Sequence, residues 1–562
     1  MKKYWGKTAL LASLCLVAFG HAAADTPTLE GLTADDLLQL LVKEGVVSPE
    51  KLKELGDKIK TRERKQSDAA VEPVAAESRD KKPDVPAGVV RVPYIPTYVR
   101  DEIRDQVRVG LKEDVAKDVL AQAKTERWGI PGVTPEWVDR ITFYGDMRLR
   151  VQSDRFGPSN QQFTYPNLNG VNSVGTSTPS ENFTNFYNTE VNRTQYLARM
   201  RLGFNAAITQ TVKVGARLVT GNQTQPGKAD QTIGTYSAKY PTDFDLAYIS
   251  YRSIEKSLYL AGGRIENPFL STDLFWHPDL TFEGFAASWW MFRSEDLTDE
   301  FTQFDPFVTL GAFPLQEISE TSQDKWLLAV QTGFTFTTIG QSKLGLALAY
   351  YDYENTRGRL NQDDNAPNAL NYTAPNFFQK GNTVFNIADT LLDPSAARYA
   401  LAANYRLANA LLSYDYAGFS PLHVVATADY VKNIGYNQKS VSELVGEDVP
   451  AQTRGYQFKF AVGWPNIQKR YDWQVSLAYK YLERDAAIDA FTDTVFHAGG
   501  TDGKGYILRF DYGLTDNVAL ALRWFNTDEI SGRMYGYPIS NGSGQRTPLA
   551  VDTLLLDLNA KF

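Results

Sequence analysis

The sequence has few of the residues on which most metal and enzyme sites depend. It contains one cysteine and four histidines among 562 residues. The cysteine, Cys15, lies in a segment that we expect to be removed, so no thiol is left for disulfides, metal ligation, nucleophilic catalysis or covalent haem attachment. Beyond residue 24 the histidines are His277, His423 and His497. We therefore predict no cofactor, no metal site and no catalytic residues.

The chain also lacks a strong net charge of one sign and a long apolar run. The 58 basic and 66 acidic side chains give a net charge of −8, which excludes the strongly basic surface that nucleic-acid binding requires. After residue 24 no segment approaches the run of about 18 apolar residues that indicates a transmembrane helix. Two classes remain open, a soluble secreted protein and an outer-membrane barrel.

The first 24 residues have the pattern of an export signal. Lys2, Lys3 and Lys7 precede an apolar stretch over residues 8–20, and alanines occupy residues 22–24. A basic start, a short apolar core and small residues at the end are typical of a cleaved signal peptide. The apolar stretch is too short for a membrane-spanning helix, which needs about 20 residues. We predict a signal peptide over residues 1–24, with Asp25 as the mature start.

From residue 141 onward, apolar and polar side chains alternate. In the segment 143–152, Met147 and Leu149 share one face, whereas Arg148 and Arg150 share the other. Successive side chains of a strand point to opposite faces, so each such strand has one apolar and one charged surface. We predict strands at 141–152, 194–207, 211–222, 243–252, 257–265, 281–293, 306–313, 325–337, 341–354, 404–416, 422–432, 454–464, 471–484, 504–513, 517–528 and 550–562.

The connections between these segments alternate in length. Long excursions such as 153–193 and 355–403 follow most odd-numbered strands, and short turns such as 208–210 and 514–516 follow most even-numbered ones. Long loops on one side and short turns on the other are typical of an outer-membrane barrel. We therefore predict an all-β transmembrane antiparallel β-barrel of about 16 strands, with a short α-helical N-terminal periplasmic segment. All of the long loops are expected to lie in water.

The last predicted strand ends on an aromatic residue. Leu558 and Phe562 share its apolar face, whereas Asp557 and Lys561 share the polar one. This resembles the terminal strand of Gram-negative outer-membrane proteins, which the barrel insertion machinery recognises. The resemblance implies that Phe562 is the insertion signal.

The predicted lumen carries basic side chains. A barrel of about sixteen strands leaves an aqueous channel, and a charge facing the middle of the bilayer costs about 2–4 kcal/mol. The alternation therefore predicts that a basic stripe lines the lumen. It consists of Arg148, Arg150, Arg199, Arg201, Lys213, Arg217 and Arg264.

The excursion 266–280 carries the acids that could face this stripe. It holds Asp273 and Asp279, and Glu283 follows it. If this loop enters the lumen, these carboxylates face the basic stripe and form a constriction that selects permeating ions. Alternatively, the arginines pair with neighbouring carboxylates such as Asp146 and only stiffen the wall.

Several short motifs resemble the putative porin family of Gram-negative bacteria. They lie in three places: Gly145 to Arg150 at the start of the barrel, Gly263 to Gly284 around the predicted constriction loop, and Asp429 to Asn433. The resemblance covers roughly residues 30–562. It implies a water-filled channel for passive diffusion of ions and small hydrophilic solutes.

The segment before the barrel is predicted to be helical. We expect a helical hairpin over 25–65, a flexible linker rich in Ala, Pro, Asp and Lys over 66–96, an amphipathic helix leading into the barrel over 97–140, and the barrel itself over 141–562. This segment docks on its own barrel, associates with other copies in a homotrimer, or contacts a periplasmic partner such as the cell wall. Other expected partners are outer-membrane lipid and lipopolysaccharide.

Three rival readings remain. An outer-membrane barrel enzyme would bring Ser, His and an acid together, and His423 is lumenal by parity. A structural or adhesion barrel would have no open pore. A soluble β protein would have its apolar faces packed in a dry core.

Overall fold

A computed structural model describes residues 140–175, 186–221, 225–291, 303–319, 321–338, 340–361, 368–390, 396–537 and 547–562. The predicted signal peptide (1–24), helical hairpin (25–65) and linker (66–96) lie outside these residues, as does the predicted helix except for its last position, Arg140. Within the described ranges, no helix has the length and apolar character needed to cross a membrane.

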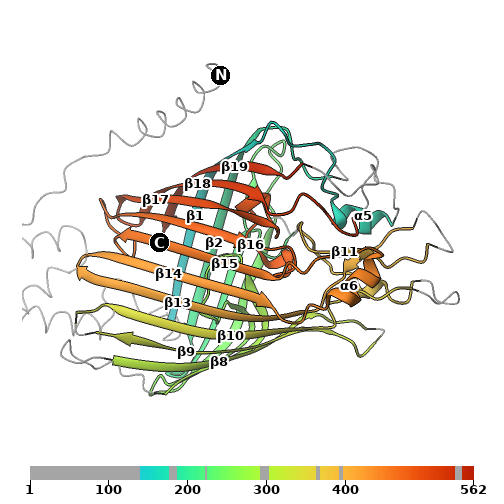
Figure 1. The fold of residues 1–562 in the computed structure, drawn as a ribbon. Helices are drawn as coiled ribbons and strands as arrows, with labels where there is room; N and C mark the ends of the chain where they lie inside the picture. Colours follow the sequence, from blue (N-terminus) through green and yellow to red (C-terminus); the bar gives the residue numbers. More distant parts are fainter. Residues whose placement is uncertain are drawn as a thin grey trace, which may run out of the picture. The chain divides into compact units, whose positions relative to one another are not determined.

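The described chain forms a closed antiparallel barrel of 16 long strands (Figure 1). Consecutive barrel strands pair with one another, and β1 closes the ring by pairing with β19. The strands are β1 (Ile141–Phe156), β2 (Arg193–Ala207), β3 (Val212–Thr220), β5 (Thr242–Arg252), β6 (Leu258–Glu266), β7 (Thr281–Trp290), β8 (Gln303–Gln316), β9 (Lys325–Thr337), β10 (Lys343–Glu354), β13 (Tyr405–Phe419), β14 (Leu422–Asn433), β15 (Arg454–Gly463), β16 (Trp473–Leu482), β17 (Gly503–Thr515), β18 (Val518–Glu529) and β19 (Ala550–Lys561).

All sixteen predicted strands are confirmed, and the long and short connections separate to opposite ends of the barrel (Figure 1). We call these the long-loop end and the short-turn end. Additional short elements lie within the long connections and were not predicted. They are α5 (Leu168–Val174), β4 (Gln231–Thr232), η2 (Asn371–Thr373), β11 (Val384–Asn386), β12 (Tyr399–Leu401), α6 (Gln438–Val445), η3 (Asp489–Phe491) and η4 (Phe496–Ala498).

The two faces of the wall have the predicted polarity. Met147 and Met200 are 46% and 49% exposed on the outer face, whereas Arg150 and Arg199 are only 6% and 5% exposed. Large apolar side chains are therefore presented outward, as a lipid-facing barrel requires. The soluble reading, with apolar faces packed in a dry core, is wrong.

The last residue helps to close the ring. The backbones of Gly145 and Phe562 exchange two hydrogen bonds, each 3.1 Å long. The Phe562 ring covers Gly145 so closely that a Cβ atom there would lie 2.4 Å from the ring. Glycine at this position therefore allows the terminal aromatic side chain to lie flat against β1.

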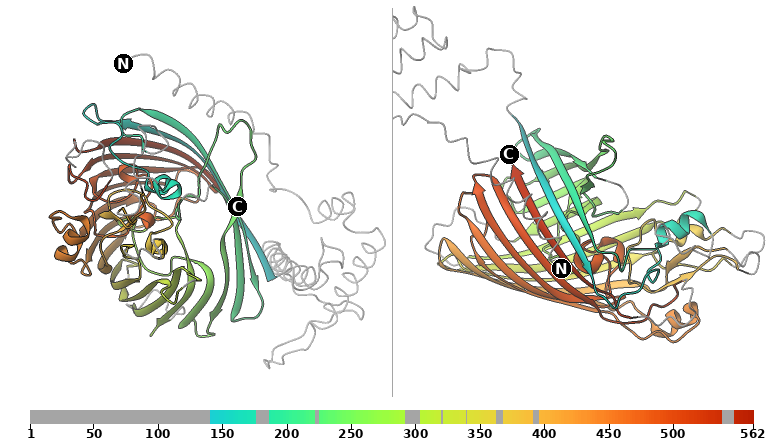
Figure 2. Two further views of the ribbon diagram at one scale, coloured as in Figure 1. Left: turned by 90° about the vertical axis from the view of Figure 1, so that its right-hand side faces the viewer. Right: turned by 90° about the horizontal axis from the view of Figure 1, so that it is seen from above.

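The interior at the long-loop end is packed with inward-folded connections. Leu274, Phe275 and Trp276, from the loop 267–280, are almost fully buried in one cluster with wall residues such as Tyr351. The connections between β10 and β13 and between β16 and β17 join the same cluster, and Figure 2 (left) shows such segments lying across the ring of strands. The expectation that all long loops lie in water is wrong, because these loops carry enough apolar side chains to form a second core inside the barrel.

Candidate channel site: an arginine ladder and an inward loop

Four of the predicted arginines lie side by side on β1 and β2. Arg148 is opposite Arg199 in the strand register, and Arg201 is opposite Asp146. Because alternate residues of a strand share a face, Arg150 points to the same side as Arg148, and Arg199 to the same side as Arg201. Antiparallel pairing thus concentrates four guanidinium groups on one patch of the inner wall.

Carboxylates from the wall and from the loop 267–280, which we call the inward loop, neutralise this patch. Asp146 accepts hydrogen bonds from Arg199 (2.7 Å) and Arg201 (2.6 Å). Asp279, at the end of the loop 267–280, accepts from Arg199 at 2.8 Å and lies 3.4 Å from Arg148. The predicted contact between the loop and the basic wall is present at Asp279.

The pKa of Asp279 reflects these neighbours. Burial alone would raise it, but the positive charges of Arg199 and Arg148 outweigh burial and hold the pKa well below the usual range. Asp279 is therefore a carboxylate at neutral pH, and it attaches the loop to β1 and β2 by ion pairs.

A second acid arrives from the connection between β3 and β5. Asp230 accepts hydrogen bonds from Arg148 (2.6 Å) and from Arg150 (2.8 Å). The sequence analysis missed Asp230, because nothing in a strand-like alternation indicates which loop residue will return to the wall.

The basic patch continues across the seam where the barrel closes. Asp557 on β19 accepts from Arg150 at 2.6 Å and from Arg523 on β18 at 2.5 Å. Arg509 on β17 pairs with Asp511 at 2.6 Å. We call the whole set the arginine ladder: Arg148, Arg150, Arg199, Arg201, Arg509 and Arg523. The alternation within the predicted strands 504–513 and 517–528 places the last two inside, so parity could have found them.

The other three predicted basic residues are not part of the ladder, and their place in one pore-lining stripe stays a prediction. Arg217 pairs instead with Asp245 (2.9 Å) on β5. Arg264 pairs with Glu283 (2.7 Å), its neighbour on β7. Lys213 is exposed near the short-turn end, where β3 begins. Residues that alternation places on the same face of the sheet therefore differ in their position along the barrel and in the carboxylate that lies nearest.

The predicted acids also separate. Asp273 does not reach the ladder: it accepts a hydrogen bond from Gln457 on β15 (2.7 Å), and its backbone carbonyl accepts from Lys480 on β16 (2.7 Å). Glu283 contacts only Arg264 among the predicted stripe. The loop 267–280 therefore runs across the lumen, attached at Asp279 to β1 and β2 and at Asp273 to β15 and β16.

Comparison with known protein families shows where this chain belongs. Residues 32–562 match the profile of a family described as putative porin. This chain belongs to that family. No curated protein sequence matches it. It is an outer-membrane porin.

Several solved structures show a distant similarity to this porin. OprB of Pseudomonas putida is 10% identical, with a TM-score of 0.43, and the alignment covers 77% of this chain and 96% of that one. The channel DcaP of Acinetobacter baumannii is 11% identical, with a TM-score of 0.37, over 75% and 97% of the two chains. OmpF of Salmonella typhi, solved with daunomycin, is 11% identical with a TM-score of 0.36 over 75% and 97%.

The histidines of the porin have local structural partners. The His277 Nδ1 atom accepts a hydrogen bond from the backbone N–H of Asp279 (2.9 Å), which fixes the turn that presents the Asp279 carboxylate. Burial lowers the pKa of His277. His423 contacts Asp415 at 2.6 Å near the short-turn end, and His497 is buried in the connection between β16 and β17. Within the described ranges, no three His, Cys, Asp or Glu side chains are arranged to hold a metal ion.

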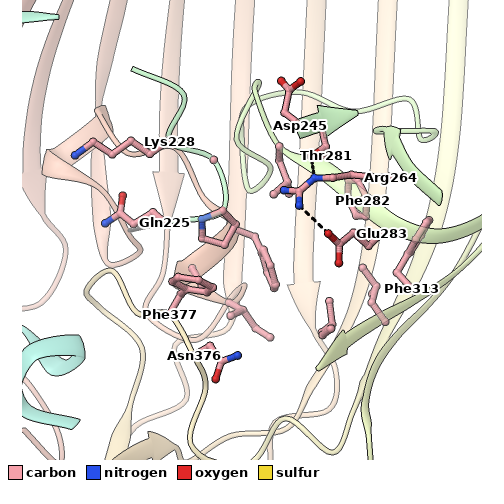
Figure 3. Close-up of a pocket in the computed structure, with 18 of the residues that line it drawn as sticks. Gln225, Lys228, Asp245, Arg264, Thr281, Phe282, Glu283, Phe313, Asn376 and Phe377 are labelled. Carbon is pink, nitrogen blue, oxygen red and sulfur yellow. Dashed lines mark hydrogen bonds and ion pairs between the residues drawn. The ribbon is translucent and has the colours of Figure 1, made fainter. Parts of the chain in front are cut away.

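A cavity of about 530 Å³ lies beside the inward loop (Figure 3). Asp279, Trp276 and Phe282 line it next to the ladder, and Asn376 and Phe377 line it at the long-loop end. It therefore joins the outer loops to the place where the loop 267–280 meets the ladder.

Proposed function

We propose that this porin is a passive channel for ions and small hydrophilic solutes, narrowed where the loop 267–280 faces the arginine ladder. The observation that carries the proposal is the double attachment of that loop, by Asp279 to Arg199 and by Asp273 to Gln457 and Lys480. Charged groups fixed in such a narrow part select among permeating ions. The channel needs no cofactor and performs no catalysis. The competing role for the ladder is purely structural, since its arginines are paired with acids.

Planar-bilayer recording of the purified full chain tests this proposal. We expect discrete conductance steps in KCl and a measurable ion preference from the reversal potential in a KCl gradient. Arg148→Glu and Arg201→Glu should each shift the reversal potential toward cations, because they reverse a charge in the narrow part. A matched control is Arg406→Glu, which removes a pair with Asp352 from an arginine that is 59% exposed. The absence of steps would favour an enzyme or a structural barrel, and steps with an unchanged reversal potential would leave the ladder a structural role.

We also propose that the segment before residue 140 is periplasmic and that Phe562 is the insertion signal. The chain enters β1 at the short-turn end, which is the periplasmic end of outer-membrane barrels. The exchange of hydrogen bonds between Phe562 and Gly145 supports a role for the last residue in closing the ring. Phe562→Ala should reduce the amount of folded barrel in outer membranes, whereas protease added to whole cells should leave the N-terminal segment intact. Outer-membrane lipid and lipopolysaccharide are the expected surroundings.

A homotrimer is proposed for a different reason. β5 carries the exposed side chains Phe244, Ile249 and Tyr251 (59%, 60% and 38% exposed). Exposed apolar side chains that lie close together are typical of a contact surface, and a second copy packed on β5 would cover them. Cross-linking tests this arrangement, because the mature chain has no cysteine of its own. Phe244→Cys, at a residue 59% exposed on β5, should cross-link copies, whereas Phe460→Cys, 52% exposed on β15, should not.

A further inference from the structure

The cavity beside the inward loop has two unlike sides. One side is aromatic and apolar, with Trp276 from the inward loop, Phe313 from β8, Phe377 from the connection between β10 and β13, and Phe491 from the connection between β16 and β17. Its volume of about 530 Å³ falls within the range of small-molecule sites, roughly 300–1,000 Å³. Charged residues line the other side of the cavity. Lys228 lies toward one end, and Arg264 and Glu283 lie toward the opposite end (Figure 3).

Two lysines of this cavity have no carboxylate partner among the described residues. Lys228 makes no side-chain hydrogen bond or ion pair there, and burial lowers its pKa. Lys325 is 4% exposed, and its ammonium group donates only to neutral acceptors, the Gln316 side chain (2.9 Å) and the Ala374 carbonyl (2.7 Å). Neither ammonium group therefore contacts a described carboxylate, although the charge of Asp230 acts on Lys228 from a greater distance.

The carboxylates of the same cavity are already engaged. Asp245 is held by Arg217 (2.9 Å), Glu283 by Arg264 (2.7 Å) and Asp279 by the ladder, and Asp243 also has a partner. A solute in the cavity thus meets aromatic surface and ammonium groups that contact no described carboxylate, but no free carboxylate.

We propose that this cavity is a binding subsite for amphipathic organic anions, carboxylates attached to an aromatic or branched apolar group, which bind there before passing to the arginine ladder. Burial of the apolar group against the aromatic side stabilises the bound solute, because it removes apolar surface from water. The carboxylate accepts a charge-assisted hydrogen bond from an ammonium group. The proposal rests on the channel function proposed above and names the class of solute that the channel prefers.

Single-channel recording in KCl with added solutes tests it. Benzoate should reduce the conductance in a saturable manner. Acetate carries the same charge without the ring, and benzylammonium carries the ring with the opposite charge. Both should act at least about tenfold more weakly, since each lacks one of the two contacts. Binding of benzoate and acetate to the detergent-solubilised full chain is measured in parallel by calorimetry, which does not depend on conduction.

Variants separate the two sides of the cavity. Lys228→Gln should weaken benzoate binding about tenfold, because it removes a hydrogen bond to a charged group. Phe377→Ala should weaken benzoate but leave acetate unchanged. The control is Lys439→Gln on α6, which alters a lysine whose side chain is 87% exposed and outside the cavity. Lys325 is left intact in the main test, because its buried hydrogen bonds contribute to folding.

The outcomes distinguish this proposal from the channel itself. Equal effects of benzoate and acetate, equal effects of benzoate and benzylammonium, or an unchanged benzoate affinity in Lys228→Gln would each overturn the subsite, even with normal conductance steps in KCl. Absent conductance steps would overturn the channel function. In that case the calorimetric comparison of benzoate with acetate still decides whether the cavity binds organic anions.

Discussion

This porin has two regions of buried carboxyl groups, and the pKa values in these regions are shifted in opposite directions. In the arginine ladder, guanidinium groups directly contact the carboxylate of Asp279 and keep its pKa well below the usual range against the effect of burial. In the connection between β16 and β17, burial dominates, and it raises the pKa of Asp489 and of Asp502 to about 7. Acids that are similarly buried therefore differ in charge. Asp279 is ionised at neutral pH, whereas Asp489 and Asp502 gain or lose a proton near pH 7.

The partners of the second group explain the difference. We call Asp485, Asp489 and Asp502 the loop carboxyl cluster. Asp489 accepts a hydrogen bond from the backbone N–H of Gln379 (3.1 Å), and Asp502 accepts from the hydroxyl of Ser531 (2.6 Å). Neutral donors stabilise a buried carboxylate less than guanidinium groups do, so a proton competes for the loop carboxyl cluster. We therefore expect the packing of the outer loops to depend on pH near neutrality, whereas the attachment of the inward loop to the ladder should not.

The largest effect is expected from removing one arginine at the centre of the ladder. Arg199 is 5% exposed and contacts both Asp146 and Asp279. Arg199→Met should lower the free energy of unfolding by about 3–5 kcal/mol, because it leaves two carboxylates without their main partner. Urea unfolding of the barrel in lipid vesicles measures this. Arg406→Met is the control, and equal losses in the two variants would show that the ladder is no stronger than an exposed pair.

The next effect concerns the loop carboxyl cluster and pH. An acid whose folded pKa is raised binds more protons in the folded state, so stability falls as the pH rises from about 4 to the folded pKa. The loops should therefore be best packed below about pH 4 and lose stability up to about pH 7, the pKa of Asp489 and Asp502. The groups that face these acids are Lys380, Arg484, Asp485, Glu529, Tyr187, Tyr405 and Tyr537.

Hydrogen exchange detects this change. After correction for the intrinsic effect of pH, peptides from residues 485–502 should exchange faster at pH 8 than at pH 5. Asp489→Asn should flatten this dependence, since the amide is neutral throughout. An unchanged slope in that variant would remove Asp489 from the explanation.

The ladder should respond to pH in the opposite direction. The pKa of Asp279 is lowered in the folded barrel, so its stabilising contribution is complete above the usual carboxyl range and is lost only as the pH falls below it. Peptides from residues 267–280 should therefore exchange faster at pH 3 than at pH 5, whereas peptides 485–502 should not. The same direction of change in both segments would refute the contrast between the two regions.

The smallest effect on stability is expected at the edge of the ladder. Arg509 pairs with Asp511, but its side chain is 44% exposed. Arg509→Gln should lower the free energy of unfolding by only about 1 kcal/mol, because the arginine of this pair is partly exposed, although Asp511 is buried. It should still move the reversal potential slightly toward cations. A stability loss as large as that of Arg199→Met would mean that the ladder acts as one cooperative unit.

Some of the site was predictable residue by residue. Alternation alone predicted that Arg148, Arg150, Arg199 and Arg201 face inward, and the hypothesis that the loop 266–280 enters the lumen put Asp279 opposite this basic wall. The same reasoning also grouped Arg217 and Arg264 with these four arginines, and that grouping stays a prediction. Parity defines a face of the sheet but not a height along the barrel, and each of these arginines met a nearer carboxylate, Asp245 or Glu283.

The sequence by itself determined the sixteen strands and the polarity of their two faces, because strand periodicity is local and lipid imposes it on every strand. Short motifs, rather than this periodicity, indicated the family. Tertiary structure alone decided which charges meet. Closure of the ring places Arg150 beside Asp557, 407 residues away in the chain, and loop folding returns Asp230 to the wall. Such pairs depend on which residues are close in space, so the alternation of apolar and polar residues along the chain cannot predict them.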